Sequence, residues 1–225
     1  MNELNIYQSI KSGYNQGARA FSDSRSTFWP ELSFIKNYIK KNDKLLDFGC
    51  GNGRLIDLLK HPQKNYLGID ISHQLVKIAR KLHPGYKFQF INFNNPQEPK
   101  NLPQKYFDII TSIAVFHHFP KGQRRSLILK KIKSLLKPQG RLIITVWNLY
   151  QPRFKKFFPK NKKNGYIPFK KGNKILFTRY FYRWQKKQLE KFIQKNNLRI
   201  IKSGLSRRNK QPVNIFVIGE NIEEK

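Results

Sequence analysis

The sequence is poor in cysteine, in acidic residues and in long apolar runs. A single cysteine, Cys50, stands among its 225 residues, which excludes an intramolecular disulfide and favours a reducing compartment. No stretch approaches the roughly eighteen apolar residues of a membrane span, and the first twenty residues lack the apolar run of a secretion signal. We therefore expect a cytoplasmic protein that does not insert into membranes.

Acidic residues number 13, against 45 lysines and arginines, which gives a formal net charge of +32. Much of the excess is lysine in a chain also rich in Asn and Ile, a composition that AT-rich codons produce, so the total charge says little about function. Its distribution says more, because residues 43–118 hold ten basic and six acidic residues, whereas 119–210 hold twenty-eight basic residues and one acid, Glu190. This uneven field predicts a polyanionic partner, nucleic acid before an anionic membrane, for the second half of the chain.

What the chain does contain is enough apolar material, 39%, for a folded core. Strand and helix patterns alternate from residue 44 onward, which predicts an α/β fold with a doubly wound, mostly parallel sheet and helices on both faces. The seven expected strands are 44–48, 66–70, 88–91, 108–115, 142–147, 198–203 and 213–218, the last antiparallel at an edge. The expected helices are 29–39, one opening at 55, 72–82 with Ser72 as N-cap, 124–136 and 185–196. The Lys-, Asn- and Pro-rich stretch 151–178 is expected to be a basic insertion or long loop.

The run 45–54, LLDFGCGNGR, lies between the first strand and the first helix. Glycines there permit positive φ and let a ligand approach the backbone, and open parallel sheets bind nucleotide-like ligands at this place. A dinucleotide fingerprint requires a glycine at the sixth position from Gly49, where Arg54 stands. The spacing present, acid-x-G-x-G-x-G, resembles motif I of class I S-adenosylmethionine methyltransferases. The simpler alternative is that these glycines form only a tight turn.

Asp70 ends the second strand, where a carboxylate accepts both ribose hydroxyls of either NAD or S-adenosylmethionine. Asn92 follows the third strand and is expected beside the adenine. Cys50 is expected to fill space in the loop, because no base stands beside it in the sequence. The resemblance implies S-adenosylmethionine as cofactor, bound by Asp47, Gly49, Cys50, Gly51, Gly53, Asp70, Ile71, Asn92, Phe93 and Ile113.

Further segments resemble the methyltransferases that esterify 5-carboxymethyluridine at the wobble position of tRNA. They are 21–25 (FSDSR), 112–119 (SIAVFHHF) and 179–182 (RYFY), within a similarity that extends from about residue 14 to 218. The chain departs from the family pattern at 148–150, Phe169 and Tyr182, which belong to the substrate side. The resemblance implies the anticodon loop of tRNA as a partner, and members of that family can require a small zinc-binding activator protein.

With this resemblance, the chain divides into four expected parts. These are an N-terminal cap with a substrate-side helix (1–42), the S-adenosylmethionine-binding core (43–150), the basic insertion on the substrate side (151–184), and the last helix with edge strands of the same domain (185–225).

A carboxylate acceptor is ionised at neutral pH, so methyl transfer to it requires alignment and exclusion of water, and no general base. Planar arginine forks suit such an acceptor, and Arg25 and Arg179 are the candidates because both lie in segments similar to the family's substrate-side motifs. For each of them, a solvated surface arginine is an equally simple interpretation. His117 and His118 follow the fourth strand and would serve as a base for a hydroxyl or ring-nitrogen acceptor. A packed or capping histidine explains them equally well, and no third ligand stands at a spacing that predicts a metal site.

The residues expected to contact RNA are basic residues of the expected loops and one aromatic ring for base stacking: Lys155, Lys156, Lys162, Lys163, Tyr180, Arg207 and Arg208. For a single lysine, a solvated surface is the simpler interpretation, and aromatic residues at such spacing more often belong to the core. Two other functions stay open: a small-molecule carboxylate or hydroxyl O-methyltransferase, which would not need the basic second half, and a catalytically weak, methyltransferase-like RNA-binding subunit.

Overall fold

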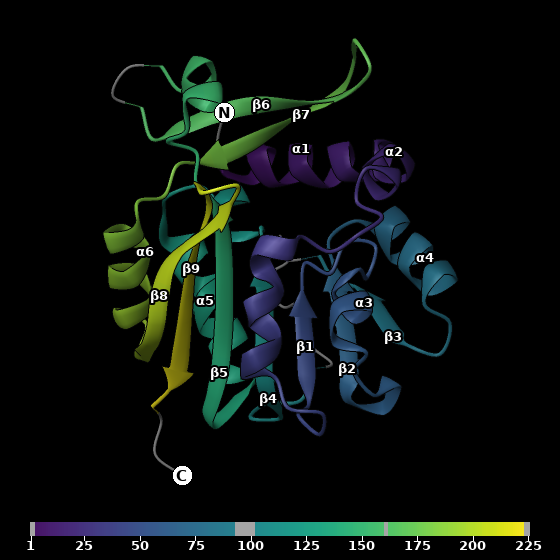
Figure 1. Cartoon of the computed structure of the whole chain (residues 1–225), viewed down its shortest axis with the longest axis vertical. Coiled ribbons are helices and arrows are strands. Elements are labelled where there is room, and N and C mark those ends of the chain that lie inside the picture. The colour runs from purple at the N-terminus through teal and green to yellow at the C-terminus, as the bar shows by residue number, and fades with distance from the viewer. Residues whose placement is uncertain (1–2, 93–101, 160–161, 223–225) are drawn as a thin grey trace.

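A seven-stranded sheet forms the centre of the molecule in a computed structural model that describes residues 3–92, 102–159 and 162–222 (Figure 1). The strand order is β3-β2-β1-β4-β5-β9-β8. The first five strands pair in parallel, and β9 lies antiparallel between β5 and β8. The prediction of a doubly wound, mostly parallel seven-stranded sheet is therefore confirmed.

The strands of this sheet are Leu45–Phe48 (β1), Tyr66–Asp70 (β2), Lys87–Phe90 (β3), Phe107–Ile113 (β4), Leu136–Trp147 (β5), Leu198–Arg208 (β8) and Gln211–Asn221 (β9). The α-helices are Glu3–Gln16 (α1), Ala18–Asp23 (α2), Leu55–Leu59 (α3), His73–Leu82 (α4), Gln123–Ser134 (α5) and Lys186–Gln194 (α6). Short 3₁₀ segments are Pro30–Tyr38 (η1), Gln63–Asn65 (η2), Phe116–His118 (η3) and Pro152–Phe157 (η4). No helix within these ranges is both long and apolar enough to cross a membrane.

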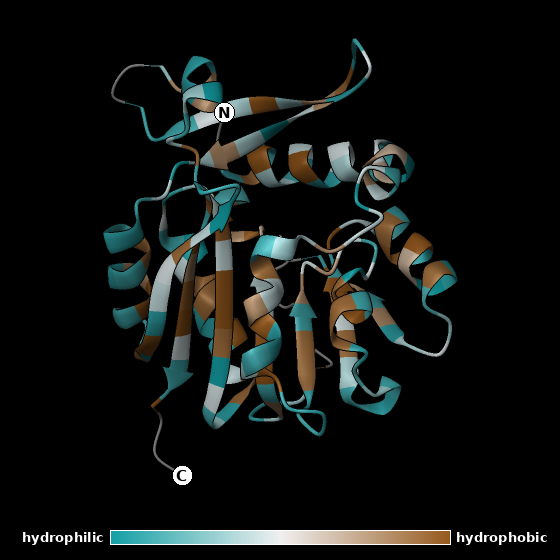
Figure 2. Cartoon of the chain, in the orientation of Figure 1, coloured by the Kyte–Doolittle hydropathy of each residue, from teal (hydrophilic) through white to brown (hydrophobic). Residues whose placement is uncertain are grey.

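Both faces of the sheet are buried, because neighbouring apolar residues of one strand enter different cores. Leu45 packs with η1, α3 and α4, whereas Leu46 packs with α5 and α6, and the pair Ile143 and Ile144 divides in the same way. Side chains alternate along a strand, so a strand covered on both faces has a continuous apolar sequence. Figure 2 shows the central strands in brown for this reason.

Several expected elements differ from the observed ones. The segment after Trp29 is a 3₁₀ helix instead of an α-helix. The last strand, β9, is antiparallel as expected, but it lies inside the sheet and β8 forms the edge. The N-cap at Ser72 is confirmed, since its Oγ accepts a hydrogen bond from the Leu75 N–H at 3.2 Å.

The basic insertion is not a loop. Its residues form η4 and an antiparallel hairpin of two strands, Asn164–Lys171 (β6) and Lys174–Tyr182 (β7), which make a separate two-stranded sheet. Ile167 and Phe181 join Phe154 of η4 in a small apolar cluster. Figure 1 shows the hairpin crossing above the carboxyl end of the main sheet, with α1 directly beneath it.

Helix α1 is an element that the sequence analysis did not predict. Its apolar residues Ile6, Tyr7 and Ile10 recur at helical spacing and enter the core shared with α5 and α6. Its last turns pack against β7, where a β-carbon added at Gly13 would lie 2.6 Å from Cδ2 of Phe177. The absence of a side chain at Gly13 therefore lets the helix approach the hairpin.

Replacing Gly13 by alanine should destabilise the protein by about 1–3 kcal/mol, because the added methyl group overpacks the contact with Phe177. Helix propensity alone would give the opposite result, a gain of about 0.5–1 kcal/mol. The free energy of unfolding from urea titration distinguishes the two. Ser12→Ala, at an exposed position of the same helix, is the control and should not destabilise. A Gly13→Ala protein as stable as wild type would contradict the close contact.

Candidate functional site

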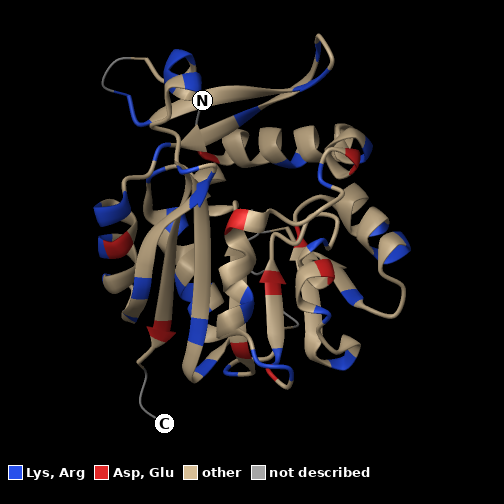
Figure 3. Cartoon of the chain, viewed as in Figure 1, with Lys and Arg blue, Asp and Glu red and all other residues tan. Residues whose placement is uncertain are grey.

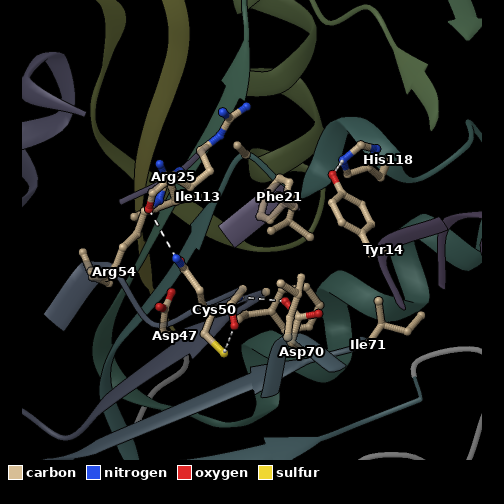
Figure 4. A pocket seen from close by; sticks show the side chains of 18 of the residues that line it. Tyr14, Phe21, Arg25, Asp47, Cys50, Arg54, Asp70, Ile71, Ile113 and His118 are labelled. Carbon is tan, nitrogen blue, oxygen red and sulfur yellow. Dashed lines mark hydrogen bonds between the residues drawn. The ribbon is translucent and has the colours of Figure 1, made fainter. Parts of the chain in front are cut away.

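A pocket of about 1060 Å³, open to solvent, lies at the carboxyl ends of β1, β2 and β4 (Figure 4). The strand order reverses between β1 and β4, so the connections that leave their ends diverge to opposite faces and leave a crevice. The loop after β1 lines this crevice, together with residues of α1, the segment after α2, and β7. The pocket therefore forms where several parts of the chain that are distant in sequence meet.

The glycine loop after β1 follows a path that side chains would obstruct. Gly49, Gly51 and Gly53 have φ values of 78°, 57° and 83°. A β-carbon on Gly49 would lie 2.3 Å from Cγ2 of Val115, whereas one on Gly51 would meet only Phe21, at 3.8 Å. The backbone at Gly51 thus stands open for a ligand to approach. Gly53 does not line the pocket and packs instead against Phe88.

Asp70, at the end of β2, is tied to this loop. Its Oδ2 accepts the Gly51 N–H at 2.9 Å, and its Oδ1 accepts the Ser72 N–H at 2.8 Å. Burial raises the pKa of Asp70 to about 6, against these hydrogen bonds, which favour the carboxylate. Each carboxylate oxygen retains capacity for another donor, so Asp70 can hold a vicinal diol from the pocket side.

Asp47, the last but one residue of β1, lies beneath the same loop. Its oxygens accept hydrogen bonds from the hydroxyls of Thr111, at 2.8 Å, and Tyr66, at 3.0 Å. Burial raises its pKa to about 6. Asp47 thus stabilises the end of β1 and also lines the pocket.

The remaining expected cofactor residues fall into three groups. Cys50, Ile71 and Ile113 line the pocket, and burial raises the pKa of the Cys50 thiol. Asn92 follows β3 but is not among the described residues that line the pocket. Phe93 lies outside the described residues.

Three arginines reach the pocket, from different elements: Arg25 after α2, Arg54 after the glycine loop and Arg179 on β7. Arg179 is 4% exposed and is surrounded by aromatic rings, with its guanidinium carbon 5.2 Å from the centroid of Phe181 and 5.3 Å from that of Phe169. The Nε atoms of Arg25 and Arg179 are buried without a hydrogen-bond partner in the described chain. Burial, and then the charge of Arg179, lower the pKa of Arg25.

The two histidines are buried at the end of the crevice and form a polar network. His118 donates from Nδ1 to the Tyr180 carbonyl at 2.8 Å, so its Nε2 accepts from the hydroxyl of Tyr14 at 2.9 Å. The backbone N–H of Trp147 donates to Nδ1 of His117 at 3.1 Å, which places the His117 proton on Nε2. Burial lowers the pKa of His118 to about 3 and that of His117 well below its usual range. Both rings are therefore neutral, and neither presents an acceptor nitrogen to a substrate.

The expected RNA-contacting residues do not form one uniform surface. Lys155 and Lys156 on η4 and Lys162 and Lys163 before β6 are all exposed, as expected. Figure 3 shows these elements and the hairpin carrying blue residues and no red ones. They lie on the same side of the molecule as the pocket, above the carboxyl end of the sheet.

Two of the residues expected to contact RNA, Tyr180 and Arg208, are not available for that contact. Tyr180 is only 4% exposed, because its position on β7 directs the ring into the core, so it presents no stacking surface. Arg208 ends β8 and gives two hydrogen bonds to the carboxylate of Glu31, at 2.8 and 3.1 Å, so its charge is already paired. Arg207, its neighbour, is exposed and contacts only the Lys210 carbonyl among the described residues.

The sequence analysis did not identify Tyr14, Phe21, Trp29 and Arg54 as residues of the site. Tyr14 and Phe21 lie near or within segments noted for their resemblance to a known family, but no local pattern shows that α1 returns over the glycine loop. Arg54 was noted only as the residue that breaks a dinucleotide fingerprint.

A methyltransferase domain family model matches residues 17–203 of the chain. A tRNA (carboxymethyluridine(34)-5-O)-methyltransferase of Arabidopsis thaliana is 33% identical over 136 residues, which are 60% of this chain and 31% of that protein. The protein of the same description from Schizosaccharomyces pombe is 26% identical over 216 residues, 87% of this chain and 91% of that one. The chain thus spans only about a third of the length of the Arabidopsis relative.

Solved structures show the same fold. An S-adenosylmethionine-dependent methyltransferase from Methanosarcina mazei superposes with a TM-score of 0.68 at 20% identity, covering 88% of this chain and all of the other. A methyltransferase from Haloferax volcanii, solved in complex with the Trm112 methyltransferase activator, has a TM-score of 0.67 at 14% identity, with 96% and 99% covered.

Replacing His118 by glutamine should reduce the pH dependence of stability. Because folding lowers the pKa of His118 to about 3, the unfolded chain binds a proton that the folded chain does not, and the stabilisation present above the usual pKa of about 6.5 is lost as pH falls. Between pH 7.5 and 5 the free energy of unfolding of wild type should fall by about 2 kcal/mol more than that of the variant. Urea titrations at the two pH values measure this difference.

In that comparison Asp47 and Asp70 contribute equally to both proteins and cancel. Parallel pH profiles for wild type and His118→Gln would show that the buried ring is not held neutral.

Proposed function

This chain belongs to the methyltransferase domain family, and from that premise we propose that it transfers a methyl group from S-adenosylmethionine to the carboxylate of 5-carboxymethyluridine at the wobble position of tRNA. The observation that carries the proposal is Arg179, a buried cation in an aromatic enclosure that faces the cofactor crevice and has no carboxylate partner in the described chain. The names of the relatives support the same substrate.

The residues at the crevice fit the cofactor. Asp70 has free acceptor capacity for the two ribose hydroxyls, and the open backbone at Gly51 leaves space for the ligand to lie against the loop. Hydrophobic side chains of Ile71 and Leu75 line the same end of the pocket and suit an adenine ring. When bound, the cofactor supplies a methyl group activated by its attachment to a sulfonium.

The acceptor side is built to hold an anion. A guanidinium fork can bind a carboxylate with two hydrogen bonds, which fixes its direction as well as its position. Arg179 offers that fork from β7, and Arg25, which is close enough for the two charges to interact, offers a second. Phe21 also lines the pocket and can give a flat base an apolar surface to contact.

The histidine pair favours a carboxylate acceptor over a hydroxyl. Deprotonation of a hydroxyl requires a base with a free acceptor nitrogen within hydrogen-bond reach. His118 uses both nitrogens, on Tyr14 and on the Tyr180 carbonyl, and His117 accepts the Trp147 N–H. A carboxylate needs no base, so the chain's task is alignment and the exclusion of water by α1 and the hairpin.

The RNA is proposed to lie across η4 and the hairpin, where the chain from 151 to 184 contains no acidic residue. Exposed lysines there can meet backbone phosphates while the wobble base enters the pocket. We also propose a cytoplasmic location, which is compatible with a tRNA substrate. The likeness to a methyltransferase solved with the Trm112 activator supports a small activator protein as a further partner.

The decisive experiment is nucleoside mass spectrometry of tRNA that contains 5-carboxymethyluridine, after incubation with the protein and methyl-labelled S-adenosylmethionine. The expected product is labelled 5-methoxycarbonylmethyluridine. Arg179→Gln should lower kcat/KM by about 100-fold or more, because the acceptor carboxylate loses a charge-assisted contact. Arg179→Lys keeps the charge but lacks the planar fork. Its kcat/KM should lie between the values for wild type and Arg179→Gln.

Label on a different nucleoside, or on a small carboxylate in place of tRNA, would refute the proposed substrate while leaving the reaction class in place. Absence of cofactor binding would instead favour the RNA-binding subunit without catalysis.

Replacing Lys155, Lys156, Lys162 and Lys163 together by glutamine should weaken tRNA binding and make it less sensitive to salt. Each lost contact with a single-stranded phosphate lowers the slope of log K against log salt by about 0.7, so the slope should fall by about 2–3. Fluorescence anisotropy with labelled tRNA at several salt concentrations measures it. The matched control is Lys40, Lys41, Lys60 and Lys64, exposed residues that precede β1 and β2 at the opposite end of the sheet. Equal losses in the two quadruple variants would contradict the proposed RNA surface.

A further inference from the structure

Tyr150 is an exposed aromatic residue that follows the pocket-lining end of β5. Trp147 ends that strand and lines the pocket, and the Cα atom of Tyr150 lies at most about 11 Å, three Cα–Cα steps, beyond it. The Tyr150 side chain is 42% exposed. It belongs to 148–150, one of the segments where the sequence departs from the resembled family. The catalytic site proposed above gives this ring no role.

The backbone around Tyr150 is held by neighbouring elements. The Asn148 N–H donates to the Val213 carbonyl, and the Asn148 side-chain amide donates to the Pro212 carbonyl, both at 2.9 Å. The side-chain oxygen of Asn148 accepts the Tyr150 N–H at 3.3 Å. Leu149 is buried in the small apolar cluster that η4 shares with the hairpin. Tyr150 is therefore presented by a braced turn, and a ligand that contacts the ring loses little affinity to ordering it.

A guanidinium supports the ring from one side. The guanidinium carbon of Arg183 lies 4.3 Å from the centroid of Tyr150 and 5.2 Å from that of Phe158. The backbone N–H of Arg183 donates to the Lys163 carbonyl at 2.6 Å, and its Nη2 donates to the Lys162 carbonyl at 3.2 Å. Arg183 is thus fixed between the ring and the start of the hairpin. A cation over one face of Tyr150 leaves the other face for a second planar group.

The surface near this ring combines positive charge with a flat group. Lys155 and Lys156 of η4 are exposed, as are Lys162 and Lys163, and residues 151–184 include no acid. Figure 3 shows these elements with blue residues and no red ones. The charge alone would attract an acidic peptide as well as a nucleic acid. An exposed aromatic ring among the cations favours the nucleic acid, whose bases present planar faces along a charged backbone.

We propose that Tyr150 stacks against an unpaired base of the RNA beside the nucleotide that enters the pocket. This inference rests on the proposed function, because it takes the anticodon loop of tRNA as the ligand. A base that moves into an enzyme pocket leaves its neighbour without a stacking partner, and an aromatic side chain can replace that partner whatever the neighbouring base is. Tyr150 thus has the role that the sequence analysis gave to Tyr180, whose ring is buried.

The test uses fluorescence anisotropy with a labelled anticodon stem-loop RNA. Tyr150→Ala should weaken binding about 5- to 150-fold, the loss expected for one base–aromatic stack. The slope of log K against log salt should equal that of wild type, because no charge is removed. Tyr150→Phe keeps the ring and should bind within about twofold of wild type.

Stem-loops with a single abasic nucleotide, placed at each loop position in turn, identify the stacked base. At one position the abasic RNA should bind wild type about as weakly as intact RNA binds Tyr150→Ala. With that RNA, Tyr150→Ala should cause no further loss, because the stack is already absent. An equal loss from Tyr150→Ala with every RNA of the series would overturn the inference, and so would a reduced salt slope, which indicates a phosphate contact.

The matched control is Tyr106→Ala, which should bind the stem-loop as wild type does. Tyr106 is 40% exposed and has Nζ of Lys44 5.9 Å from its ring centroid, but it precedes β4 at the opposite end of the sheet. Equal losses in the two variants would overturn the inference. Should Tyr150→Ala fail to fold, Tyr150→Leu keeps apolar bulk without the aromatic face, and the same abasic series decides.

The outcomes separate this inference from the proposed function. Wild-type affinity in Tyr150→Ala would overturn the stacking role and leave the methyl transfer to tRNA standing. Failure of the wild-type protein to bind the stem-loop would overturn the RNA substrate together with the stacking role.

Discussion

Three guanidinium groups share one pocket, and no carboxylate in the described part of the chain forms an ion pair with any of them. Removing a charge from water without a counter-ion is unfavourable, so the fold must supply something in its place. Aromatic faces do so in part: Trp29 lies under Arg54, and four rings surround Arg179. A bound anion would supply the remaining compensation, so the pocket is suited to an anionic group such as the carboxylate of the proposed substrate.

This constraint explains why the pocket is assembled from distant segments. An arginine held on a flexible loop would turn to solvent, whereas Arg179 on β7 is paired in register with Ile167 of β6. The hairpin in turn packs against α1. Gly13 of this helix permits contact with Phe177, and the hydroxyl of Tyr14 forms a hydrogen bond with His118. The contacts between α1 and the hairpin thus also keep Arg179 buried beside the pocket.

Much of the sheet could be predicted because its signals are local: buried parallel strands are continuous apolar runs, and the glycine loop and Ser72 cap have their own short patterns. The hairpin of β6 and β7 could not be predicted, because a segment so rich in lysine has the composition of a loop. The alternation of buried Ile167 and Phe169 with exposed Tyr166 and Lys170 was the available signal. The hydrogen bond between Tyr14 and His118 joins residues 104 positions apart, and no local sequence pattern predicts such a contact.

The shortage of acidic residues in the second half of the chain affects both the protein surface and the interior of the pocket. On the surface it leaves the lysines of η4 and the hairpin without acidic partners among the described residues, and such a surface would attract a polyanion without regard to its sequence. Inside the pocket Arg179 has no acidic partner among the described residues, and its buried Nε has no hydrogen-bond partner there. An acid placed near the hairpin would weaken both effects together, because it would neutralise the surface field and offer Arg179 an internal partner. In the proposed function, attraction of the RNA and recognition of the modified base would therefore depend on the same shortage of acids, one at the surface and the other inside the pocket.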